Sequence, residues 1–122
     1  MCKRVLVVDD LHINRLLLKE IIKSIERSIV VVEAVDGHDA LQKVIGGNFD
    51  MIFMDIQMPV MSGLDCTRYI RKELKLTVPI IAVTAYAYFG NGLSSDDGFD
   101  EVFIKPFRPE LIKSVLQLHK IV

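Results

Sequence analysis

Short, almost wholly apolar runs alternate with longer segments of helical period along this sequence. The runs occupy residues 5–8, 29–32, 51–54, 80–83 and 102–104. None of them alternates between apolar and polar residues, so both faces of each strand are predicted to be covered, as in a parallel sheet between helices. The alternation therefore predicts an α/β fold with an open, doubly wound, five-stranded parallel sheet.

The segments between the runs predict the helices. Apolar residues at spacings of three and four predict a buried helical stripe at Ile13, Leu16, Leu17, Ile21 and Ile25. Further helices are expected at 37–45, 62–76 and 109–118. Their expected inward residues include Ala40, Leu41, Val44 and Ile45 in the second helix and Leu111, Ile112, Val115 and Leu116 in the last. Segment 86–98 is rich in glycine and has little periodicity, so a fourth helix there should be weak or irregular.

Length and composition limit the remaining classes of protein. A chain of 122 residues predicts one domain, 1–122, and 51% hydrophobic residues indicate a globular core. The net charge of -1 gives no basic field for nucleic acid or a membrane surface. No apolar run reaches the roughly 18 residues of a membrane span or resembles a signal peptide, so a cytoplasmic protein is expected. Cys2 and Cys66 have no paired ligand spacing and are expected to be free thiols.

Polar residues follow four of the five apolar runs. Asp9 and Asp10 follow the first run, Asp55 the third, Thr84 the fourth and Lys105 the fifth. An acid at one strand end is often only a turn former or a helix cap. In a parallel sheet, however, these residues all reach the same edge, where doubly wound folds bind ligands. The combination of groups favours a functional site.

The chemistry of this set predicts a cation and an anion together. Two unit charges about 4 Å apart interact by roughly 4 kcal/mol at an effective dielectric constant near 20, so clustered carboxylates need a positive partner. Carboxylates and waters suit Mg²⁺, which commonly also contacts a phosphate oxygen. Lys105 and the Thr84 hydroxyl could hold a phosphoryl group beside the metal. An in-line carboxylate could then form an aspartyl phosphate.

Two motifs accompany this set. They are residues 55–63, Asp-Ile-Gln-Met-Pro-Val-Met-Ser-Gly, and Lys105-Pro106-Phe107. Over essentially the whole chain, the ordered combination closely resembles the response-regulator receiver domain of two-component signalling. The form of residues 55–63 and the pair Asn14-Arg15 is more similar to receivers attached to hybrid sensor kinases. The resemblance implies the flavodoxin-like strand order 2-1-3-4-5.

The resemblance also implies a Mg²⁺ site and its ligands. Asp10 would bind the metal directly, and Asp9 would reach it through water. Asp55 and the backbone carbonyl of Gln57 would complete the protein's share of the coordination. Mg²⁺ is therefore the expected cofactor.

The same resemblance assigns the phosphoryl chemistry. Asp55 would be the phosphoacceptor, Thr84 would bond a phosphoryl oxygen after activation, and Lys105 would pair with the phosphoryl group. The Lys105–Pro106 peptide is expected to be cis. A histidine kinase or a histidine phosphotransfer protein would supply the phosphoryl group. The domain itself would be no enzyme beyond Mg²⁺-dependent self-phosphorylation and autodephosphorylation, would bind no nucleic acid or membrane, and would be a monomer or weak dimer.

Three other functions compete with this interpretation. A phosphatase with an aspartate nucleophile generally needs a second acid two residues on, where this chain has Gln57. A nucleotide or flavin module would need a glycine-rich phosphate loop after the first strand, where Asp9 and Asp10 stand instead. A receiver that binds partners without phosphorylation would not need the complete acceptor set.

The sequence departs from the family at Val102. Receivers commonly carry Tyr or Phe three residues before the lysine, and that ring turns inward on activation. Phe103 cannot substitute, because adjacent strand residues point to opposite faces. A β-branched valine has few rotamers and no long lever. Activation is therefore expected to act through ordering or displacement of residues 86–98.

Overall fold

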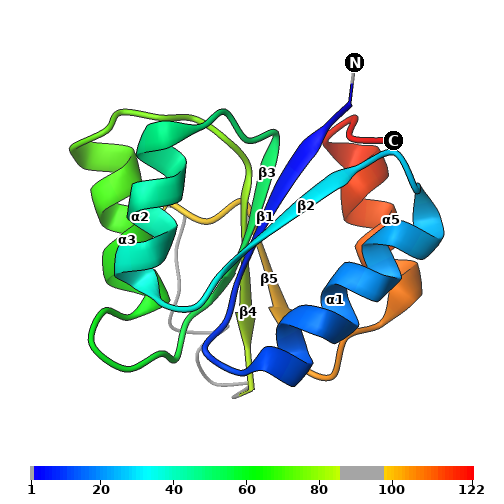
Figure 1. The fold of residues 1–122 in the computed structure, drawn as a ribbon, viewed down its shortest axis with the longest axis horizontal. Coiled ribbons are helices and arrows are strands. Elements are labelled where there is room, and N and C mark those ends of the chain that lie inside the picture. Colours follow the sequence, from blue (N-terminus) through cyan, green and yellow to red (C-terminus); the bar gives the residue numbers. More distant parts are fainter. Residues whose placement is uncertain (1, 86–97) are drawn as a thin grey trace.

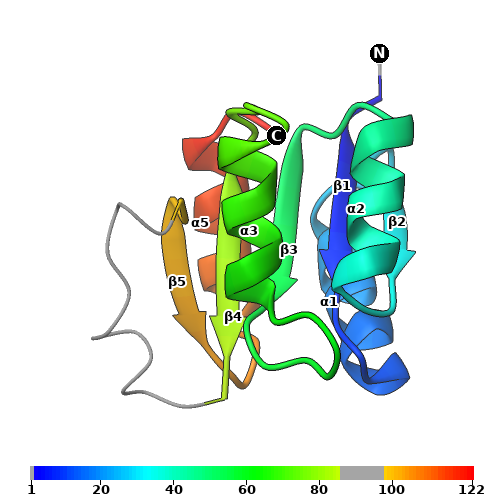
Figure 2. The ribbon, with the colours of Figure 1, turned by 90° about the vertical axis from the view of Figure 1, so that its left-hand side faces the viewer.

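The computed structural model describes residues 2–85 and 98–122 of the chain. The strands are β1 (Arg4–Val8), β2 (Val30–Ala34), β3 (Met51–Asp55), β4 (Ile80–Thr84) and β5 (Glu101–Ile104). They form one sheet in the order β2-β1-β3-β4-β5, and every neighbouring pair is parallel. Figure 2 shows this order across the sheet. The predicted α/β class and strand order are confirmed.

Two layers of helices enclose the sheet. The helices in the described ranges are α1 (His12–Ile25), α2 (Gly37–Gly46), α3 (Gly63–Lys72) and α5 (Pro109–Leu118). Helices α1 and α5 cover one face of the sheet, and α2 and α3 cover the other (Figure 1). The weak fourth helix predicted at 86–98, and the proposed response of that segment, fall almost entirely outside the described residues.

Alternate residues of each strand supply two hydrophobic cores. On β1, Leu6 and Val8 pack toward α2 and α3, whereas Val5 and Val7 pack toward α1 and α5. All four side chains are at most 2% exposed. Because the strands are covered on both sides, they need the continuous apolar runs seen in the sequence.

Val102 and Phe103 follow the same rule on β5. Val102 packs against the core beneath α2 and α3, and Phe103 packs against the opposite core. The two side chains therefore lie on opposite faces of the sheet, as predicted. The phenyl ring of Phe103 cannot occupy the position of Val102.

The predicted buried stripe of α1 is wrong for its first half. Ile13, Leu16 and Leu17 are 65%, 40% and 47% exposed, while Leu18 and Ile22 are almost completely buried. The helix carries apolar residues around more of its circumference than one contact with the sheet can cover. Spacing alone did not identify the buried part.

Smaller errors concern α2, α3 and α5. Ile45 and Leu111 were expected to face inward, but they are 65% and 42% exposed. Helix α3 ends at Lys72 rather than at residue 76, because the chain turns out of the helix. Lys75 there has a left-handed φ of 55°, and the N–H of Leu76 donates to the Ile70 carbonyl. Periodicity did not reveal this turn.

Candidate functional site

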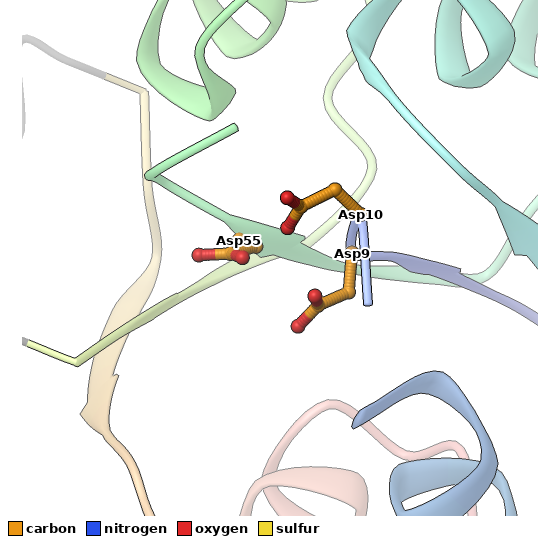
Figure 3. A group of neighbouring side chains, drawn as sticks. All are labelled: Asp9, Asp10 and Asp55. Carbon is orange, nitrogen blue, oxygen red and sulfur yellow. The ribbon is translucent and has the colours of Figure 1, made fainter. Parts of the chain in front are cut away.

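The predicted site residues meet at the carboxyl edge of the sheet. Asp9 and Asp10 follow β1, and Asp55 ends β3, so their carboxylates lie together (Figure 3). One oxygen of each carboxylate lies within 4.8 Å of the others. Asp9 and Asp55 are only 3% and 4% exposed, whereas Asp10 is open to solvent. The cluster therefore has a buried floor and one exposed acid.

Lys105 is the cation nearest this cluster among the described residues. Its Nζ lies 3.0 Å from Asp9 Oδ2 and 3.4 Å from Asp55 Oδ2. The Lys105 N–H also donates to the Thr84 carbonyl at 2.7 Å, which ties the end of β5 to the end of β4. The Lys105–Pro106 peptide is cis, as predicted. Thr84 is fully buried beside this connection.

Backbone donors hold the two buried carboxylates. Asp9 Oδ1 accepts the Leu11 N–H at 2.9 Å, and the Asn14 side-chain amide lies 3.5 Å away. Asp55 Oδ1 accepts the Gln57 N–H at 3.1 Å. The main chain of Gln57 therefore contacts the Asp55 carboxylate, while the Gln57 side chain is exposed.

Gly63 lets α3 approach Asp55 closely. A Cβ atom at Gly63 would lie 2.0 Å from the Asp55 carbonyl oxygen, far inside van der Waals contact. The Gly63 N–H donates to the Ile56 carbonyl at 3.0 Å, and the Ser62 side chain caps the helix by accepting the Asp65 N–H. The loop after β3 is thus closed tightly behind the acidic cluster.

Burial raises the pKa of Asp55 from 3.8 to about 6, with the nearby Asp9 carboxylate adding to the rise. The Lys105 ammonium and the Gln57 N–H oppose that change in pKa. The charged form of Asp55 is therefore less favourable than in a solvent-exposed aspartate, and a further cation nearby would stabilise it. Oxygen donors with uncompensated negative charge are the ligands that Mg²⁺ prefers. The residues present fit a Mg²⁺ ion.

Asp55→Asn should stabilise the metal-free protein at pH 7.5. The folded state keeps the Asp55 proton up to a pKa of about 6, whereas the unfolded chain loses it near 3.8. The folded state thus binds more protons in that window, and stability falls as pH rises from about 4 to 6. The change in pKa corresponds to at most roughly 3 kcal/mol. Because asparagine also loses the Lys105 ion pair, we expect a gain of about 2 kcal/mol.

Urea denaturation in EDTA at pH 7.5 and pH 4.5 would measure this gain. Most of it should disappear at pH 4.5, where Asp55 is protonated in the folded protein. Saturating Mg²⁺ should stabilise the wild type by mass action and remove the advantage of the variant. If the variant were no more stable than the wild type at pH 7.5, the charged Asp55 carboxylate would not destabilise the metal-free fold, and the prediction would be wrong.

Arg15 and Gly63 contribute to this site, but sequence reasoning gave Arg15 no part in it and gave Gly63 only the shaping of the loop after Asp55. Arg15 is 9% exposed, and its guanidinium donates to the Asp9 carbonyl. The sequence did contain one indication of the role of Arg15: an arginine within the apolar pattern of a helix, shortly after the Asp9-Asp10 pair. Gly63 was visible only as part of a motif, because close approach of two backbones leaves no pattern in the sequence.

The comparison with known families agrees with this geometry. The sequence model of the family described as "Response regulator receiver domain" matches residues 5–117. The chain therefore belongs to the response-regulator receiver domains. Receiver domains act in two-component signalling, where phosphorylation on aspartate is their general function. Members of this family bind Mg²⁺ at an acidic pocket, and this chain has an acidic group of Asp9, Asp10 and Asp55.

Curated relatives include hybrid kinases and a response regulator. The osmosensing histidine protein kinase SLN1 of Saccharomyces cerevisiae is 36% identical over 119 residues, covering 93% of this chain and 10% of that protein. The sensor kinase/phosphatase LuxQ of Vibrio vulnificus is 39% identical over 110 residues, covering 88% and 12%. The rice two-component response regulator ORR41 is 36% identical over 121 residues, covering 93% and 91%. The chain thus spans only about a tenth of the two kinases.

Solved receiver structures have the same fold. The response regulator TrrA of Thermotoga maritima, in complex with Mg(2+)-BeF, has a TM-score of 0.84 and 38% identity over 96% of this chain and 98% of that one. The receiver domain of sensor histidine kinase PA1611 of Pseudomonas aeruginosa, with magnesium in its active site cleft, has a TM-score of 0.85 and 30% identity, covering 97% of each chain. Within residues 2–85 and 98–122, no helix has the length and apolarity to cross a membrane.

Proposed function

We propose that residues 1–122 form a receiver domain that accepts a phosphoryl group on Asp55. The observation that carries this proposal is the buried Asp55 carboxylate, which lies between two further acids and Lys105 at the carboxyl edge of the sheet. A phosphoryl group needs a nucleophile and cations on its oxygens. This cluster offers both in one place.

The proposed step is a transfer between two side chains. An Asp55 oxygen forms a P–O bond while the P–N bond of a phosphohistidine breaks, and the electron pair returns to the imidazole. Lys105 and Thr84 would bind oxygens of the transferred phosphoryl group, because they lie at the ends of β5 and β4 beside Asp55. Asp9, Asp10, Asp55 and the Gln57 carbonyl would hold the Mg²⁺. When bound, this ion supplies positive charge to the carboxylates and the phosphoryl oxygens.

The exposed half of α1 supports a protein as phosphodonor. Ile13, Leu16 and Leu17 lie on the helix that follows the Asp9-Asp10 pair and are largely exposed. A pocket of about 310 Å³ beside them is lined by Asn14, Leu17, Ala85, Lys105, Pro106 and Phe107. Exposed apolar patches of this kind mark interaction sites. A histidine kinase or histidine phosphotransfer protein docked here would reach Asp55.

The domain as a whole would act by accepting and losing one phosphoryl group, with no turnover of a separate substrate. It would be a cytoplasmic monomer or weak dimer. It would bind neither nucleic acid nor membrane. The exposed Gln57 offers no general acid of the kind that an aspartate-based phosphatase needs.

Incubation with Mg²⁺ and acetyl phosphate would test the acceptor. Intact-mass analysis should show one added phosphoryl group on the wild type and none on Asp55→Asn. Asp65→Asn is the matched control, because Asp65 is exposed on α3 and should leave labelling unchanged. Equal labelling of Asp55→Asn and the wild type would remove Asp55 from its proposed role.

A further inference from the structure

Arg15 is a nearly buried cation that the chemistry above does not use. Its Nη1 donates to the Asp9 carbonyl at 2.9 Å, and its Nε donates to Glu33 Oε1 at 3.0 Å. Its Nη2 lies 3.4 Å from His12 Nδ1. One guanidinium on α1 therefore connects the carboxyl end of β1 to β2.

The Asp9 carbonyl belongs to the peptide unit that joins Asp9 to Asp10. Because a peptide unit is planar, holding its oxygen fixes the direction in which the chain enters Asp10. Within the described residues, the exposed Asp10 carboxylate has no hydrogen bond or ion pair. Asp9, by contrast, is held by Lys105 and by the Leu11 N–H. The backbone of the Asp9–Asp10 turn therefore sets the point from which the Asp10 side chain extends toward Asp9 and Asp55.

The start of α1 depends on the same contacts. Leu11 occupies the N-cap position and supplies no side-chain cap. The Asp9 carboxylate accepts the Leu11 N–H, and the Arg15 N–H donates to the Leu11 carbonyl at 3.2 Å. Arg15 is thus bound to both sides of the acidic turn, through its backbone and through its guanidinium.

Glu33 fixes the orientation of the guanidinium. Glu33 lies on β2, and its carboxylate is also 3.9 Å from Lys19 Nζ. A guanidinium is planar and presents its donors in a rigid fork, so a bond to Glu33 aims the remaining N–H groups. A lysine at this position has one nitrogen and could not reach both partners with the same geometry.

We propose that Arg15, oriented by Glu33, is a positioning residue for the Mg²⁺ site. Its bond to the Asp9 carbonyl holds the Asp9–Asp10 peptide so that the Asp10 carboxylate stays beside Asp55. This inference rests on the proposed function and adds to it a residue that touches neither the metal nor the phosphoryl group.

The direction in which Mg²⁺ affinity changes when Arg15 is replaced distinguishes a positioning role from a purely electrostatic one. Removing a positive charge near a cation site should by itself strengthen Mg²⁺ binding, and more so when Glu33 is left unpaired. Loss of positioning should weaken Mg²⁺ binding, because Asp10 no longer stands ready as a ligand. A merely structural role would lower stability and leave the affinity of the folded protein unchanged.

Calorimetric titration with Mg²⁺ at fixed ionic strength would test this. We expect Arg15→Met to weaken binding about tenfold, as is typical for residues that orient metal ligands, and Arg15→Lys to weaken it by about threefold. Glu33→Gln should weaken it less than Arg15→Met, since the amide oxygen still accepts from Nε. Lys19→Met is the matched control: it removes a positive charge from α1 near Glu33, and affinity should stay within about twofold.

Urea denaturation of each variant would show that the measured affinity belongs to folded protein. Unchanged or tighter Mg²⁺ binding by folded Arg15→Met would overturn the inference. If Arg15→Met shows no cooperative unfolding, Arg15→Lys decides, and affinity equal to wild type would then overturn it. A wild type that binds no Mg²⁺ would contradict the proposed function itself, whereas wild-type binding with unaffected Arg15 variants contradicts only this inference.

Discussion

Asp10→Ala is expected to lower Mg²⁺ affinity about 100-fold and to abolish phosphorylation by acetyl phosphate. The exposed Asp10 carboxylate completes the acidic group with Asp9 and Asp55, and no other described acid joins this group. Losing one charged ligand of a dication should cost about 3 kcal/mol of binding free energy, which is a hundredfold. Without the metal, the buried Asp55 and the phosphoryl oxygens would lack their main positive partner.

Lys105→Ala should separate metal binding from phosphorylation. The Lys105 ammonium pairs with the Asp9 and Asp55 carboxylates, so it competes with Mg²⁺ for the same oxygens. Removing it should leave Mg²⁺ affinity at or above that of the wild type, while labelling falls because an anion partner is missing. Metal titration and intact-mass analysis of both variants would measure this. Similar losses of Mg²⁺ affinity in Asp10→Ala and Lys105→Ala would contradict the division of roles.

Gly63→Ala should destabilise the fold by about 3 kcal/mol and impair phosphorylation. The added Cβ would lie 2.0 Å from the Asp55 carbonyl oxygen and 2.9 Å from Ile56 Cα, so backbone must move. Overpacking of this kind typically costs about 1–3 kcal/mol, and contact with backbone places it at the upper end. For a domain of this size, the melting temperature should fall by about 10 °C. The displaced residue is the proposed phosphoacceptor itself.

Gly37→Ala is the matched control for this prediction. Its Cβ would also be crowded, at 2.7 Å, but the neighbour is the side chain of Met61. A flexible thioether chain can move, so we expect a cost below about 1 kcal/mol. Thermal denaturation of the two variants would compare them. Equal losses of stability in the two variants would show that contact with backbone at Gly63 costs no more than contact with a side chain at Gly37.

Much of the fold could be predicted because parallel strands covered on both faces leave a direct signal. The strands therefore had to be mostly apolar, with glutamates only on the edge strands β2 and β5, and the apolar runs matched the strands to within two residues at each end. Since parallel strands all point the same way, the polar residues that follow them had to reach one edge. Asp9, Asp55 and Lys105 could therefore be brought together before any tertiary contact was known.

Tertiary structure alone decided what depends on the packing of one element against another. Ile13 and Leu18 are equally apolar, and only the docking of α1 on the sheet leaves the first 65% exposed and the second 2%. Arg15 is a surface residue by type, yet the adjacent Glu33 and the Asp9 carbonyl give it a buried place. Such contacts are directional bonds between particular side chains and backbone groups, and they leave no periodicity in the sequence. The sequence by itself determined the strands and the acids at their ends; the folded structure determined which side chains hold those acids in place.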